Sequence, residues 1–179
     1  NFEKFKEITR AELKGYILKS LNGTHHDIAK VIYQMFKHEF VCSSSKRKNW
    51  YQFTNHRWIE LDDAVELKRK ISNDVVNEYL KLSSDLSKKA SELDDDDSMK
   101  EIEMDRVKRL GNIAMQLRRS TFKKNVLEFC VELFYVPKFE EKLDNNVNLI
   151  GFENGVYDLE ADQFRDGLPE DYIKIGRAS

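Results

Sequence analysis

The feature that most constrains the fold is the stretch 61–93, in which apolar side chains recur at steps of three or four positions. Residues at this spacing share one side of an α-helix, so the stretch predicts one long amphipathic helix that starts at Asp62 or Asp63. Four adjacent aspartates follow at 94–97. Like charges repel and resist burial, so we expect an acidic, solvated loop there. The apolar positions are Leu67, Ile71, Val75, Tyr79, Leu82, Leu86 and Leu93.

The same periodicity predicts further helices on both sides of this one. Thr24 is a plausible N-cap for the second of them, and Ser120 for the last. Only seven glycines and two prolines occur among the 179 residues, which favours helices over a turn-rich β architecture. The predicted helices cover 11–21, 25–38, 98–119 and 120–134.

In two segments, successive side chains alternate between two faces, as they do in β-strands. Residues 50–54 and 57–61 flank Asn55-His56 and predict a hairpin, with a short strand at 39–42 before it. In the region 146–175, Asn154-Gly155 lies between apolar flanks and predicts a second hairpin. We therefore expect a single α+β domain over 1–179, predominantly α-helical, with one internal and one C-terminal β-hairpin.

No catalytic motif is present. The sequence contains no GxxxxGK[ST] phosphate loop, no GxGxxG, no HExxH, no CxxC and no GxSxG. His25 and His26 are adjacent and would diverge on a helix, and the four aspartates lack the spacing of a calcium loop. We expect no catalytic residue, no metal ligand and no cofactor in this chain, and neither ATP hydrolysis nor primer synthesis by it.

Cys42 and Cys130 lie in apolar surroundings, which is typical of a reduced, intracellular protein. No apolar run approaches the ~18 residues of a membrane span, and there is no signal peptide. The chain starts with Asn1 rather than Met, so we expect it to be a piece of a longer protein.

Charge is distributed unevenly along the chain. Lys100–Lys124 contains eight Lys/Arg and three Asp/Glu, whereas Lys138–Tyr172 contains three Lys/Arg and ten Asp/Glu. Clustered cations at a helix–helix junction can follow nucleic-acid phosphates. They can equally form a solvated face that offsets the carboxylates, and both interpretations stay open. The candidate phosphate-binding residues at this junction are Arg118, Arg119, Lys123 and Lys124.

The stretch 46–61 combines aromatic and basic residues, including both tryptophans of the chain. At least half of its rings are expected in the core, Trp58 among them, because burial of large rings stabilises a fold strongly. Single strands are bound by cations together with an exposed ring, and Trp50 is the ring that we expect to meet a base. The cations at the ends of the hairpin, where burial is not expected, are Lys46, Arg47, Lys48 and Arg57.

The order of these segments resembles the domain immediately N-terminal to the superfamily 3 helicase in poxvirus-type and giant-virus primase-helicases, a module also found in phage and plasmid primases. The resemblance rests on NWYQFTNHRWIEL and on NGVYDL followed by PEDYI, and it covers about Leu21 to Ile175. The turn TNHR departs from the Asp-Gly turn that relatives often have. The matching residues are Trp50, Tyr51, Trp58, Asn154, Gly155, Val156, Asp158, Leu159, Pro169, Glu170, Asp171, Tyr172 and Ile173.

The resemblance implies a longer parent protein that unwinds DNA during viral replication and forms a ring, expected to be a hexamer. ATP and Mg²⁺ would bind in an ATPase domain that follows this chain, with 146–175 leading toward it. The expected location is the host-cell cytoplasm or the virion. The expected partners are single-stranded DNA, duplex or fork being alternatives, and further copies of the parent protein, without a membrane.

Two functions follow as hypotheses. The chain is expected to bind single-stranded DNA through phosphates, largely independently of sequence, next to the ATPase ring. The alternative is an oligomerisation or protein-interaction module without DNA contact, in which the acidic C-terminal region meets the basic middle of another copy. A winged-helix interpretation, which predicts a preference for duplex, is a third.

Overall fold

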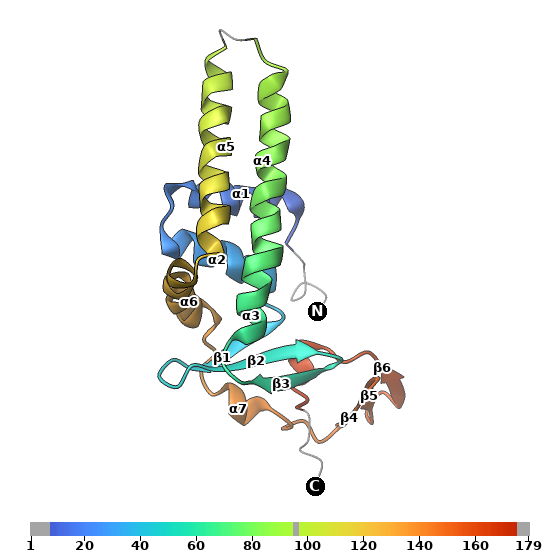
Figure 1. Ribbon diagram of the computed structural model, residues 1–179. Helices are drawn as coiled ribbons and strands as arrows, with labels where there is room; N and C mark the ends of the chain where they lie inside the picture. The colour runs from blue at the N-terminus through green and yellow to red at the C-terminus, as the bar shows by residue number, and fades with distance from the viewer. Residues whose placement is uncertain (1–7, 95–96, 175–179) are drawn as a thin grey trace. The chain divides into compact units, whose positions relative to one another are not determined.

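The computed structural model describes residues 8–94 and 97–174 (Figure 1). The chain divides into two compact units. The helical unit comprises Asn1–Met35 and Glu66–Leu133, and the sheet unit comprises Phe36–Val65 and Phe134–Ser179. The predicted class, α+β and predominantly helical, is confirmed. Asp95 and Asp96, half of the predicted acidic loop, lie outside the described residues.

The helical unit is built around two long antiparallel helices, α4 and α5, which lie side by side (Figure 1). The predicted helix over 61–93 begins later, at Val65, and widens into a π-helical turn, η3, before α4. Its apolar stripe is buried from Leu67 to Leu86, as the spacing predicts. The elements are α1 Arg10–Lys19, η2 Ser20–Asn22, α2 His25–Phe36, α3 Val65–Lys70, η3 Ile71–Val75, α4 Val76–Ser91, α5 Ser98–Leu117 and α6 Ser120–Phe134.

Caps and one buried hydrogen bond fix the N-terminal helices. The Oγ1 of Thr24 accepts a hydrogen bond from the backbone N–H of Asp27 at 3.3 Å, which confirms Thr24 as the N-cap of α2. Gly23, with φ of 76°, ends η2. The hydroxyls of Ser20 and Tyr79 hydrogen-bond at 2.6 Å in the core, which joins η2 to α4. Burial raises the pKa of the Tyr79 hydroxyl above its ordinary range.

The sheet unit contains two small antiparallel sheets, with orders β1-β2-β3 and β4-β5-β6. Both predicted hairpins are present, and each is extended by a further strand. The elements are β1 Phe40–Ser44, β2 Asn49–Thr54, β3 Arg57–Leu61, α7 Phe139–Lys142, β4 Leu149–Phe152, β5 Gly155–Asp158, β6 Gln163–Arg165 and the 3₁₀ turn η4 Pro169–Asp171.

The two hairpin turns differ in how closely they match the prediction. Asn55 and His56 both have positive φ, 47° and 67°, as a two-residue turn between twisted strands requires. In the second hairpin Phe152 pairs with Gly155, so the turn residues are Glu153 and Asn154, one position earlier than predicted. Gly155 belongs to β5 instead. A Cβ there would lie 2.6 Å from the carbonyl oxygen of Arg165, so only glycine lets β6 approach.

An aromatic cluster forms the core of the sheet unit. Trp58 is 3% exposed, and its ring packs edge to face on Phe139 with centroids 5.0 Å apart. Its indole Nε1–H donates to the carbonyl oxygen of Pro169 at 2.8 Å, and its backbone N–H donates to that of Ile173 at 2.7 Å. The C-terminal segment is thereby fixed to β3, and the core position predicted for Trp58 is confirmed.

Candidate nucleic-acid interface

The most prominent basic element of the sheet unit is the loop Ser45–Lys48, which connects β1 to β2 and is called the basic loop below. Lys46, Arg47 and Lys48 are all exposed. The loop is a defined turn, because the backbone N–H of Arg47 donates to the Oγ of Ser44 at 3.2 Å and that of Lys48 to the Ser44 carbonyl oxygen at 2.7 Å. Three successive cations are therefore held together at one end of the sheet.

Trp50 does not have the exposed position that was predicted for it. The side chain is 2% exposed, and its ring packs against Phe134 with centroids 5.6 Å apart. The prediction was wrong because β1 makes β2 a central strand, and Phe134, distant in sequence, covers this ring. Tyr51, the next residue, is equally buried at 2%. Neither ring can stack on a base without unfolding of the sheet.

Arg57 lies at the other end of β2 from the basic loop. It pairs with Thr54 beside the turn Asn55-His56, so the length of β2, about 20 Å for six residues, separates the two sites. The prediction of an exposed Arg57 was also wrong in part, because its Nε is buried and has no hydrogen-bond partner among the described residues. Arg57 therefore does not belong to the basic loop.

The second predicted basic element is in the helical unit, where α5 ends and α6 begins; it is called the basic junction below. Arg118, Arg119 and Lys124 are exposed there. Lys123 is partly buried, and its Nζ donates to the Oγ of Ser72 at 2.7 Å, so part of its hydrogen-bonding capacity is used within the fold. Of the four predicted residues, three present their charge to solvent.

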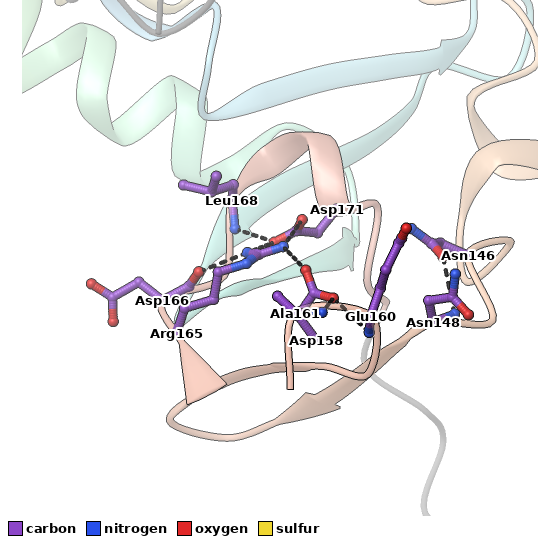
Figure 2. Close-up of polar contacts among 9 residues, drawn as sticks. All are labelled: Asn146, Asn148, Asp158, Glu160, Ala161, Arg165, Asp166, Leu168 and Asp171. Carbon is purple, nitrogen blue, oxygen red and sulfur yellow. Dashed lines mark hydrogen bonds and ion pairs between the residues drawn. The ribbon is translucent and has the colours of Figure 1, made fainter. Parts of the chain in front are cut away.

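The acidic C-terminal motif is held together by an arginine–aspartate pair (Figure 2). The guanidinium of Arg165 binds both carboxylate oxygens of Asp171, at 2.7 and 2.8 Å, and lies 3.7 Å from the carboxylate of Asp158. The backbone N–H of Leu168 donates to Asp171 at 2.7 Å. The Asp171 hydrogen bonds raise the pKa of Arg165 further above its ordinary value. The NGVYDL and PEDYI motifs thus meet through Asp158, Arg165 and Asp171. The role of these three side chains is to hold the C-terminal region together.

The second sheet has an exposed apolar face. Ile150 pairs with Tyr157 and Tyr157 with Phe164, so these side chains project from the same side, as does Phe152 two residues along. Ile150, Phe152 and Phe164 are 45%, 46% and 48% exposed. This face is called the apolar face below. Three adjacent exposed large side chains exceed the scattered apolar residues of an ordinary surface.

One exposed ring lies beside the basic loop and was missed by the sequence interpretation. Tyr135 is 42% exposed and forms a parallel bridge with Cys42 of β1. The backbone N–H of Val136 donates to the Cys42 carbonyl oxygen at 3.0 Å. No sequence signal distinguishes Tyr135, because it follows the predicted helix 120–134 and its neighbour in space is remote in the chain.

The histidines and cysteines have structural surroundings. Within residues 8–94 and 97–174, no group of three or more His, Cys, Asp or Glu side chains could hold a metal ion. Cys42 and Cys130 are buried free thiols, and burial raises the pKa of each. His25 and His26 pack edge to face on Phe122 and Phe129. Among the helices of the described part of the chain, none is long and apolar enough to cross a membrane.

The segment that contains both sheets and both motifs is matched by a known protein family. Residues 29–175 match the family described as "D5 N terminal like", so the chain belongs to this family. It is 40% identical over 173 residues to "Putative helicase L207/L206" of Acanthamoeba polyphaga mimivirus, a match that covers 97% of the chain. It is 32% identical over 179 residues to "Putative helicase 022R" of Frog virus 3 (isolate Goorha), with 84% of the chain covered. The chain spans 18% of the length of each of these relatives.

Proposed function

We propose that this chain binds single-stranded DNA through its phosphates, as an accessory domain of a viral replication helicase. The observation that carries the proposal is the basic loop, a defined turn on which the successive residues Lys46, Arg47 and Lys48 are all exposed. Cations grouped in this way bind phosphates regardless of base sequence. The basic junction supplies a second set of exposed cations in the helical unit.

The separation of charge within the sheet unit supports this proposal. The acidic second sheet is attached at the opposite end of β2, where the backbone N–H of Gly167 donates to the Nδ1 of His56 at 3.1 Å. The distance across β2 exceeds the ~8 Å Debye length at physiological salt, so the carboxylates of the second sheet are largely screened from a strand at the loop. Glu140 is closer to the loop, since it accepts a hydrogen bond from Ser43. The basic loop can therefore attract phosphates although the C-terminal region is acidic.

In the longer protein, this domain would hold the strand next to an ATPase domain that binds ATP and Mg²⁺. The relatives' names support the helicase context, and their greater length leaves room for such a domain. Assembly into a hexameric ring and a primase activity in the same parent protein belong to the proposal as well. This chain would contribute binding and no catalytic residue.

The test is a fluorescence-anisotropy titration of labelled single strands at several salt concentrations. Replacing Lys46, Arg47 and Lys48 with Ala together should weaken binding of every sequence. The slope of log affinity against log salt should flatten by about 0.7 for each phosphate that is no longer neutralised, roughly 2 in total. A matched control replaces the exposed Lys14, Lys19 and Lys88 with Ala, which removes the same charge elsewhere. Equal affinity and slope for both variants would contradict a role of the loop.

Self-association is a second candidate, and the apolar face is the observation that favours it. Glu153, Glu160 and Asp162 lie in the turns around this face, whereas the basic junction follows the exposed Met115 of α5. The apolar and charged groups of the apolar face and of the basic junction are complementary. We therefore consider the basic junction of a second copy as the partner that binds the apolar face. Repeated head-to-tail contacts of this type can close a ring.

Sedimentation equilibrium tests the second candidate. Phe164→Asp should dissociate an assembly that uses the apolar face, and raised salt should weaken that assembly in the wild-type chain. Leu80→Asp on α4, at a similarly exposed position, is the matched control. If the wild-type chain remains a monomer at all concentrations, or if both variants behave as the wild type does, the apolar face does not mediate self-association.

A further inference from the structure

Four residues of the sheet unit lie in a row across the first sheet, with two buried residues in the middle and an exposed ring at one end. Leu61 pairs with Trp50, Trp50 pairs with Cys42, and Cys42 bridges to Tyr135. Side chains of paired residues project from the same face of a sheet. Trp50 occupies the interior of this row, and Tyr135 occupies its outer edge. The edge position explains why Tyr135 is 42% exposed and Trp50 only 2%.

The outer end of this row adjoins the basic loop. Tyr135 is in register with Cys42, three residues before the loop begins at Ser45. Because the pairing of β1 shifts register between Cys42 and Ser44, these three residues span at most about 10 Å. That distance corresponds to roughly three stacked nucleotides at 3.4 Å each along one strand. A strand whose phosphates lie on the basic loop therefore brings a base within reach of the Tyr135 ring.

The charges around Tyr135 are compatible with a bound strand. Lys138 follows three residues later and is exposed, although it also lies 3.9 Å from the carboxylate of Glu141. Two further carboxylates flank Tyr135 in the chain, the exposed Glu132 three residues before it and Glu140 five residues after it. Glu140 accepts a hydrogen bond from the Oγ of Ser43 at 2.8 Å. This hydrogen bond lowers the pKa of Glu140, so the carboxylate is charged but engaged within the fold.

We propose that Tyr135 is the ring on which a base of the bound single strand stacks. The proposal rests on the proposed function. It assigns the base-stacking role that was expected for Trp50 to a residue at the exposed end of the same row. Because every base has a π-face, stacking adds affinity without sequence preference. It also gives a preference for single strands, since the bases of a duplex are stacked on one another.

Two substitutions of Tyr135 in the 179-residue chain test the proposal by anisotropy. Tyr135→Ala should weaken binding of a single strand about 5- to 150-fold, which is the range that base–aromatic stacking energies correspond to. The salt slope should be unchanged, because the cations that neutralise the phosphates are all retained. Tyr135→Phe should bind as the wild type does. Leu80→Ala, which removes an equally exposed apolar side chain on α4, is the control.

A second measurement separates stacking from an indirect effect on the fold. A strand made entirely of abasic nucleotides should bind wild type and Tyr135→Ala equally, since no base remains to stack. If the loop triple variant loses affinity while Tyr135→Ala does not, the proposed function stands and the stacking role is wrong. If the wild-type chain binds no single strand, both are wrong. A loss for Tyr135→Ala that persists on the abasic strand also overturns the stacking role.

Discussion

Trp58 joins the C-terminal segment to the first sheet through three kinds of contact. Its ring packs on Phe139, its indole Nε1–H donates to Pro169, and its backbone N–H donates to Ile173. Trp58→Ala should lower the free energy of unfolding by roughly 3–5 kcal/mol, the usual cost of removing a large buried aromatic ring. Urea denaturation followed by circular dichroism measures this. Phe164→Ala, on an exposed ring, should cost under ~0.5 kcal/mol, and equal losses for both variants would contradict the difference in packing.

The contrast between Trp50 and Tyr135 shows what the sequence could tell about the site. Alternation along β2 correctly indicates which residues share a face, and the exposure of Lys46, Arg47 and Lys48 follows from their polar loop. Which face is covered depends on Phe134, whose position next to Trp50 is a tertiary contact without a local signal. The exposed ring beside the loop was missed for the same reason.

At the scale of elements, the pairing of α4 and α5 includes one buried carboxylate. Glu103 of α5 is 1% exposed. It accepts a hydrogen bond from the Nζ of Lys89 on α4 at 3.0 Å, and Arg106 lies at 3.3 Å. The Lys89 hydrogen bond is the main reason why the pKa of Glu103 is lowered, and it outweighs the burial that would raise it. The folded state therefore favours the ionised carboxylate.

This pairing predicts a pH-dependent contribution to stability. Because the pKa of Glu103 is lower in the folded state, its contribution is fully present above the ordinary value of 4.5 and is lost as the pH falls through the folded pKa. Glu103→Gln should be less stable than the wild type at pH 7, and the difference should shrink below about pH 4.5. Urea denaturation at a series of pH values measures this. A pH-independent loss for Glu103→Gln would mean that packing alone is affected.

The elements that the sequence predicted correctly are those with a local period. The three/four spacing located α4 and α5, and alternation located β2 and β3. The third strand β6, the single turn α7 and the π turn η3 were not predicted. Each is short, and β6 depends on the close approach of Arg165 to Gly155, which only the folded chain reveals. The long elements could thus be predicted from the local sequence pattern, whereas the short elements depend on tertiary contacts that the sequence does not reveal.

At the scale of the whole molecule, each unit carries its own exposed cations. The basic loop belongs to the sheet unit and the basic junction to the helical unit. The net charge of −2 for the whole chain gives no indication of either cluster of cations. Screening confines each set to its surroundings, since the Debye length is only about 8 Å at physiological salt. If the chain binds nucleic acid as proposed, the affinity is therefore a local property of these surfaces and cannot be inferred from the total charge.

The final prediction concerns whether both surfaces bind the same strand. Arg118→Ala together with Arg119→Ala should flatten the salt slope for a long strand by about 0.7 for each phosphate that these arginines neutralise. If one strand contacts both surfaces, the wild-type slope should become steeper with strand length, so strands of about 8 and about 30 nucleotides are compared. Combining the junction and loop substitutions should add their losses in binding free energy, as expected for independent sites. Anisotropy with both strands measures all of this. If the junction variant keeps the wild-type slope on the long strand, Arg118 and Arg119 form a solvated face that offsets the carboxylates, and the basic loop alone binds the strand.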